Sequence, residues 1–300
     1  MAELKFHISE NQVSRLKTVR LEESELNELK SARSKLLAIL SLEDLYDQII
    51  ESFLEFKTQL YSNSLSLINN FRRDYNEHHE VRSKLNRQLF NTLNLSKIYL
   101  DKNFHERKKN YFVKNITEDL ALHEECIVLR NKIYDENSNY RLGCGLRNLA
   151  QHSTLPIHTY SVGTEHLQED KNKSIRAQFH LPLAKENLIK SGIKKNILTS
   201  FGEIVDLHEV MDGYIYAISQ MHMQNRKLTE STITGAVNTF LSKTKEIETV
   251  YGKDNFGIGV FDNDERLFHL ELEWYEVVKY LKHKHAVAVN YGNVEHTTYL

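Results

Sequence analysis

Apolar residues recur every three or four positions over long stretches of this chain, which is the spacing of amphipathic helices. The clearest run covers residues 45–71. The same spacing predicts helices over 41–71, 81–102, 117–135, 138–154, 200–226 and 230–250. Two prolines and eleven glycines are few for 300 residues, so little interrupts these helices. We expect long antiparallel helices with short connections, which pack as a bundle.

Capping residues predict where several helices begin and end. Residues 9–12, a serine followed three positions later by a glutamine, have the form of a capping box and predict a polar helix over 10–38. Thr117 and Ser200 are expected to open two further helices, because their hydroxyl groups can accept hydrogen bonds from the first free backbone N–H groups. Gly252 is expected to close the last helix.

Beyond Pro156 the pattern changes to an alternation of apolar and polar residues, which is the period of a strand. Residues 157–162 and 175–181 alternate in this way around a polar turn. Residues 256–262 and 267–274 alternate around a second turn, which predicts a hairpin.

Together these patterns predict a mainly α protein in two parts. Residues 1–156 are expected to form an antiparallel helical bundle. Residues 157–300 are expected to form a mixed α+β extension of short strands and two long helices, which can pack on the bundle as one unit.

Composition narrows the class of protein. Hydrophobic residues make up 40% of the chain and charged residues 27%, as in a globular protein, and the formal net charge is -2. Any nucleic-acid contact must therefore come from a local basic patch. The two cysteines, Cys126 and Cys144, do not suggest a disulfide framework. No signal peptide and no long apolar segment occur in the sequence. We expect a cytoplasmic protein that does not contact membranes.

The candidate chemistry is concentrated in the predicted helix 138–154. It contains Arg147, Asn148 and His152 on about one and a half turns. Asn148 and His152 are four residues apart and share a face, whereas Arg147 points about 100° to the side of Asn148. One helix therefore makes a loose site. Two such helices facing each other, in a homodimer, would surround one phosphate group with two histidines and two arginines.

These residue types suit the cleavage of RNA, which brings its own nucleophile in the 2′-OH group. His152 can take or deliver a proton near neutral pH. Arg147 can bind the phosphate oxygens and stabilise charge that develops on phosphorus. Asn148 can orient the imidazole or the substrate. This chemistry leaves a 2′,3′-cyclic phosphate and needs no metal and no cofactor.

The motif is short, and an Arg-Asn/Asp pair with a histidine at this spacing arises by accident in roughly one chain in ten. A second match does occur here, at Arg73, Asp74 and His78, within a polar break. Whether Arg73 and His78 contribute to a site stays open.

The run from Tyr140 to Pro156, with Arg147, Asn148 and His152 on the last helix of a bundle, resembles the HEPN superfamily. The resemblance implies a helical bundle that dimerises through its motif helices. It also implies a metal-independent endoribonuclease of a prokaryotic toxin or antiviral defence system. Arg147, Asn148 and His152 would then be the catalytic residues, and an antitoxin or sensor protein would be a partner.

Other residues allow further interpretations. Arg107, Lys108 and Lys109 form a basic stretch that can bind RNA phosphates. The residues His123, Cys126, Cys144 and His152 lack the short Cys-x-x-Cys spacing of a zinc site, so no metal is expected. The alternative to an enzyme is a non-catalytic helical module that binds RNA, a nucleotide or a protein.

Overall fold

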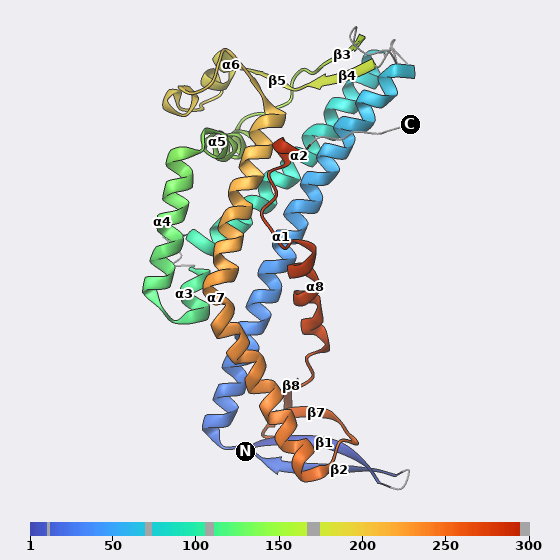
Figure 1. Cartoon of the computed structure of the whole chain (residues 1–300), viewed down its shortest axis with the longest axis vertical. Coiled ribbons are helices and arrows are strands. Elements are labelled where there is room, and N and C mark those ends of the chain that lie inside the picture. The colour runs from blue at the N-terminus through green and yellow to red at the C-terminus, as the bar shows by residue number, and fades with distance from the viewer. Residues whose placement is uncertain (11–12, 70–73, 106–110, 167–174, 295–300) are drawn as a thin grey trace. The chain divides into compact units, whose positions relative to one another are not determined.

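The computed structural model of the chain describes residues 1–10, 13–69, 74–105, 111–166 and 175–294. The helices are α1 (Glu23–Asn69), α2 (Tyr75–Phe104), α3 (Phe112–Thr117), α4 (Leu120–Glu136), α5 (Ser138–His152), α6 (Lys185–Lys190), α7 (Leu207–Tyr251) and α8 (Glu276–Lys284). The strands are β1 (Ala2–Glu10), β2 (Val13–Arg20), β3 (Ser161–His166), β4 (Ile175–His180), β5 (Pro182–Ala184), β6 (Ile204–Asp206), β7 (Asn255–Asp262) and β8 (Glu265–His269). The chain is thus mainly α with a smaller β part, as predicted (Figure 1).

Within the described residues, no helix combines the length and the apolar content that crossing a bilayer requires.

The chain divides into two compact units. The first contains residues 1–44, 113–119 and 226–286, and the second contains 45–112, 120–225 and 287–300. Neither unit is a continuous stretch, and both predicted parts, 1–156 and 157–300, contribute to each unit. The helices α1 and α7 also contribute residues to both.

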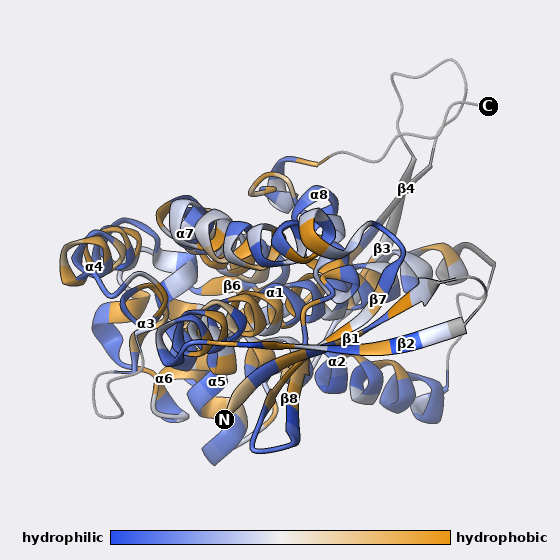
Figure 2. Ribbon diagram, turned by 90° about the horizontal axis from the view of Figure 1, so that it is seen from below, coloured by the Kyte–Doolittle hydropathy of each residue, from blue (hydrophilic) through white to orange (hydrophobic). Residues whose placement is uncertain are grey.

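The first unit contains a four-stranded antiparallel sheet in the order β2-β1-β7-β8. The prediction of a helix over 10–38 is wrong here, because β1 and β2 form a hairpin and α1 begins only at Glu23. Leu4, Phe6 and Ile8 are buried at every second position of β1. Apolar and polar segments alternate along both strands (Figure 2). This period of two is the signal of a strand, and it outweighs the capping signature.

A buried ion pair in the first unit explains two further errors. The start signal at 41–44 predicts that a helix begins there, and the pattern over 200–226 predicts that another ends near 226. Instead α1 and α7 continue through them. Arg226 Nε and Nη2 donate hydrogen bonds to Glu43 Oε1 and Oε2 at 2.9 and 2.6 Å, and Glu43 is fully buried. Glu43 and Arg226 therefore satisfy each other's charge inside continuous helices.

Some helix ends also differ from the prediction. Thr117 is the last residue of α3 and does not open a helix, because Glu118 adopts a positive φ of 61° that breaks the chain direction. Ser200 lies outside α7, which begins at Leu207. Gly252 follows α7 with a φ of 86°, as predicted for a closing glycine.

Other elements are confirmed. The predicted helices 81–102 and 138–154 correspond to α2 and α5. The predicted strand 175–181 is β4, but its antiparallel partner β3 spans Ser161–His166, so the predicted strand 157–162 is wrong except at its last two positions. The predicted hairpin near the C-terminal end is β7–β8. The polar turn itself lies largely outside the described residues.

The second unit has a core that mixes apolar and polar groups. His222 is fully buried and stacks on Tyr46 with ring centroids 3.8 Å apart. The Tyr99 hydroxyl lies 3.1 Å from His222 Nδ1 and accepts a hydrogen bond from Asn225. Cys126 donates to the same asparagine. Each polar group thus has a partner, which buried polar groups require.

A buried ion pair also lies in the second unit. Lys57 Nζ donates to both carboxylate oxygens of Asp212, at 2.8 and 3.1 Å, and lies 2.8 Å from His208 Nε2. Burial lowers the pKa of His208; the Asp212 charge opposes this shift, and the Lys57 charge adds to it. The imidazole is therefore kept neutral beside the ammonium group.

Helix α5 crosses α7 at two glycines. Figure 1 shows α5 nearly end-on beside the length of α7. A Cβ atom on Gly143 would lie 2.4 Å from Tyr214 Cδ2, and one on Gly213 would lie 2.6 Å from Asn139 Cβ. The missing side chains let the two backbones approach, and this contact fixes the position of the helix with the candidate motif.

Replacement of Gly143 tests this crossing. We expect Gly143→Ala to lower the free energy of unfolding by about 1–3 kcal/mol, because the new methyl group overlaps the Tyr214 ring. Gly145→Ala is the matched control, since its Cβ would meet Ile193 at 3.6 Å, an ordinary contact, and should stabilise the helix by about 0.5–1 kcal/mol. Urea unfolding of the three proteins measures both effects. Equal behaviour of the two variants would contradict a close crossing.

Candidate functional site

Helix α5 holds the candidate motif on a well-defined frame. Asn137 caps its start and accepts a hydrogen bond from the Tyr140 backbone N–H at 3.0 Å. Its apolar stripe is buried and consists of Tyr140, Leu142, Leu146 and Leu149. The helix ends at His152, where the N–H groups of Ser153 and Thr154 both donate to the Leu149 carbonyl.

Asn148 and His152 lie together at the wall of one cavity. Both side chains are exposed, and both line a cavity of about 390 Å³. Arg141 and Lys194 line the same cavity, and no aspartate or glutamate is among its described lining residues. We call it the cationic cavity. Its charge suits an anionic ligand.

Arg147 lies elsewhere on α5. Its Nη1 donates to Gln151 Oε1 at 2.7 Å, and Gln151 Nε2 in turn donates to Asn94 Oδ1 of α2 at 2.7 Å. Arg147 is not among the residues that line the cationic cavity. One chain therefore brings Asn148 and His152 together but leaves Arg147 on a neighbouring face, as the five-residue spacing predicts.

Arg141 and Lys194 are cavity cations that the sequence analysis missed. Arg141 precedes Asn148 by seven residues, two helical turns, so it shares the face of Asn148 and His152 and could have been found. Its Nη1 donates to the carbonyls of Tyr134 and Asp135 at 2.6 Å, which leaves other guanidinium N–H groups available. Lys194 gives no such signal, because it follows α6 in a segment that has no periodic pattern.

Cys144 forms part of the cavity wall but is a poor nucleophile. Burial raises the pKa of its thiol to about 11. Burial also raises the pKa of Cys126 to about 12. Both thiols therefore stay protonated at neutral pH, and the thiolate is the reactive form.

The other candidate residues suggested by the sequence do not gather into one site. Within the described ranges, no three His, Cys, Asp or Glu side chains lie close enough to hold a metal ion. The basic stretch Arg107, Lys108 and Lys109 lies outside the described residues, as does Arg73. Asp74 forms a capping box with Glu77 at the start of α2, and His78 Nδ1 lies 2.6 Å from the Tyr160 hydroxyl. The second motif thus contains a helix cap.

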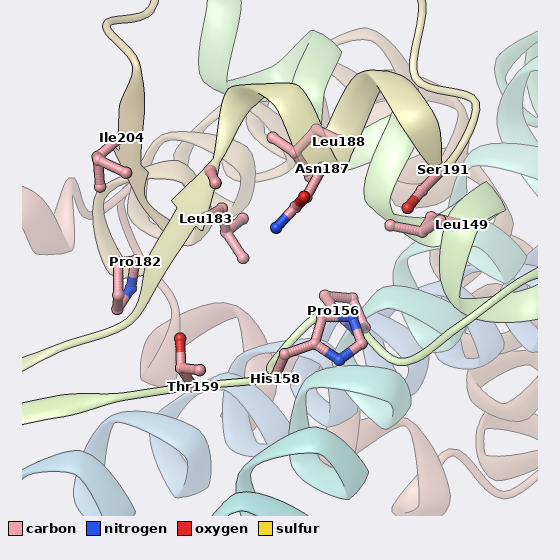
Figure 3. Close-up of a pocket in the computed structure, with 11 residues that line it drawn as sticks. Leu149, Pro156, His158, Thr159, Pro182, Leu183, Asn187, Leu188, Ser191 and Ile204 are labelled. Carbon is pink, nitrogen blue, oxygen red and sulfur yellow. The ribbon is translucent and has the colours of Figure 1, made fainter.

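A second cavity adjoins the first. It has a volume of about 230 Å³ and shares Leu149 and Ser191 with the cationic cavity. We call it the apolar cavity, because most of its wall is made of aliphatic side chains and two prolines (Figure 3): Leu149, Pro156, Pro182, Leu183, Ala184, Leu188 and Ile204.

The floor of the apolar cavity is held by α2. The buried side chain of Asn86 donates to the Ile157 carbonyl at 2.8 Å and accepts from the Ile157 N–H at 3.0 Å. Arg82 Nη1 donates to the His158 carbonyl at 3.1 Å. The segment that follows the motif helix is therefore fixed by three hydrogen bonds to one helix.

No protein-family model, no curated protein and no solved structure matches this chain.

Replacement of Asn86 tests the fixed floor. We expect Asn86→Ala to lower the free energy of unfolding by about 2–4 kcal/mol, because the buried N–H and C=O of Ile157 both lose their partner. Asn91→Ala on the exposed face of the same helix is the matched control and should change stability by less than about 0.5 kcal/mol. Chemical denaturation measures both. A small effect at Asn86 would show that water replaces the amide and that the floor is loosely held.

Proposed function

We propose that this chain is a metal-independent endoribonuclease of the HEPN type, acting in the cytoplasm as a homodimer in a prokaryotic toxin or antiviral defence system. One observation supports this proposal most directly. The exposed His152 and Asn148 share a cavity lined by Arg141 and Lys194, without a carboxylate among its described residues. An imidazole beside bound phosphate is what RNA cleavage without a metal requires.

The proposed reaction uses the 2′-OH group of RNA as nucleophile. A neutral His152 takes the 2′-OH proton while the 2′-oxygen forms a bond to phosphorus. The bond from phosphorus to the 5′-oxygen breaks, and the same His152, now protonated, delivers its proton to that oxygen. Cationic side chains stabilise the charge on the phosphate oxygens. The products are a 2′,3′-cyclic phosphate and a free 5′-OH group.

The position of Arg147 favours a site shared between two copies. In one chain Arg147 bonds to Gln151, away from the cationic cavity. A symmetric pair of α5 helices would allow Arg147 of one copy to meet the phosphate beside His152 of the other.

The same geometry supports a second candidate function. Arg141 and Lys194 in the cavity, with Arg147 outside it, also suit a module that binds RNA or a nucleotide without cleaving it. An antitoxin or a sensor protein would be the further partner in either case.

Cleavage of a mixed RNA pool in the presence of EDTA tests the proposed reaction. We expect wild-type protein to leave cyclic phosphate ends and His152→Ala to cleave about 10²–10⁴-fold more slowly, the usual contribution of a general acid or base. His283→Ala, which removes another exposed histidine on α8, is the matched control and should cleave normally. Mass spectrometry identifies the product ends. Equal cleavage by wild type and His152→Ala would refute this site, and binding without cleavage would favour the second candidate.

Mixing two inactive variants tests the shared site. Arg147→Ala and His152→Ala are each expected to be inactive alone. If Arg147 acts with His152 of the other copy, half of the mixed dimers' sites are intact, and activity should return to roughly a quarter of the wild-type level after subunit exchange. A site within one chain predicts no recovery. Cleavage rates across a series of mixing ratios distinguish the two outcomes.

A further inference from the structure

We propose that the two adjoining cavities bind a single nucleotide, with its phosphate in the cationic cavity and its base in the apolar cavity. This inference rests on the proposed function for the idea of an RNA ligand and adds a residue, Asn187, that reads the base.

The size and walls of the apolar cavity suit a flat ring system. Drug-sized ligands occupy cavities of roughly 300–1,000 Å³, so a cavity of about 230 Å³ takes a smaller ligand, such as one base. Pro156 and Leu149 lie on one side and Pro182 and Leu183 on the other (Figure 3). Apolar surfaces of this kind pack against the faces of any base.

Asn187 supplies the polar contact that a base needs. Its side chain points from α6 into the apolar cavity, across from His158 (Figure 3). The amide makes no hydrogen bond to another residue in the described part of the chain. A carboxamide presents a donor and an acceptor side by side, which matches an adjacent acceptor and donor on the edge of a base. The geometry thus places a base-reading group inside an apolar wall.

The two cavities form one surface with separated chemistry. Leu149 and Ser191 line both, so the two cavities lie side by side. Arg141 and Lys194 lie only in the cationic cavity, and Asn187 lies only in the apolar one. A nucleotide has the same division between a charged phosphate and an uncharged base.

The floor of the apolar cavity is fixed before a ligand arrives, and the helix that carries Asn187 has a closed end. The hydrogen bonds from Arg82 and Asn86 hold the floor at 157–158. Asn187 lies on α6, which is closed by the N–H groups of Ser191 and Gly192. A preformed site loses little conformational entropy on binding.

Calorimetric titration of the full-length protein with defined probes tests the inference. The probes are the four nucleoside 3′-monophosphates, the four nucleosides and inorganic phosphate; none of these can be cleaved as RNA is. We expect at least one nucleoside 3′-monophosphate to bind more tightly than both its nucleoside and inorganic phosphate.

Two variants assign the parts of the ligand. Asn187→Ala should weaken binding of that nucleotide about tenfold, the effect of lost hydrogen bonds to the base, and leave phosphate binding unchanged. Lys194→Ala should weaken both the nucleotide and phosphate. Asn196→Ala, an exposed asparagine outside both cavities, is the matched control and should change neither.

A third variant tests how Asn187 reads the base. A carboxylate in its place only accepts hydrogen bonds, so Asn187→Asp should raise the affinity for guanosine 3′-monophosphate relative to the other three, because guanine offers two adjacent N–H donors. Circular dichroism confirms that each variant is folded.

The outcomes separate this inference from the proposed function. Nucleotides that bind no more tightly than inorganic phosphate, or an Asn187→Ala variant that binds them normally, would overturn the base site even if the protein cleaves RNA. Base-dependent nucleotide binding by a protein that cleaves no RNA would support the base site and refute the nuclease.

Discussion

The buried ion pair between Glu43 and Arg226 is the constraint on which the two longest helices depend. Glu43 is fully buried and Arg226 nearly so, and removing either partner would leave an uncompensated charge, which costs several kcal/mol. The pair lies at the polar stretches where α1 and α7 would otherwise break. Earlier on α7, Gly213 and Tyr214 support the crossing with α5. The position of the candidate motif thus depends on interactions outside α5 itself.

Helix α2 gives the candidate site its second support. Asn94 receives the hydrogen bond from Gln151, and Asn86 fixes the backbone of Ile157. The amide side chains of one helix therefore orient both the last turn of α5 and the chain that follows it. This explains why two cavities with different chemistry can lie so close together. Rigid elements on each side keep the charged groups and the apolar wall from merging.

The local sequence correctly predicted the elements that form a helix or a strand whatever packs against them. In α2 and α5 the apolar stripes are long enough to specify a helix, and Leu89 and Leu146 are fully buried as the period requires. The sequence failed at the hairpin of β1 and β2, where a capping signature predicted a helix over 10–38 and the short alternation of period two in β1 was not recognised. Its decisive partner, β7, lies far along the chain and leaves no local trace.

The same limit applies to the candidate site: residues that share one helix face were predictable, and residues from other segments were not. Asn148 and His152 follow from their spacing, and Arg141 could have been added from the same face of the helix. Lys194 and Asn187 could not, because they come from an aperiodic segment that folds against α5. Only tertiary structure brings such residues together. Neither the HEPN resemblance nor the role of Arg147 follows from the fold, and both stay predictions.

The sheet order of the first unit also affects how the protein is made. β1 is paired on one side with β2, but its other edge needs β7, and Ile8 is paired with Asn255. At roughly 5–20 residues per second, a ribosome takes on the order of 10–50 s to synthesise the chain between these strands. During that interval the inner edge of the hairpin presents free N–H and C=O groups beside Leu4 and Phe6. Unpaired edges of this kind recruit other strands. The nascent chain therefore passes through a period in which aggregation competes with folding, and a chaperone that covers the hairpin would raise the yield.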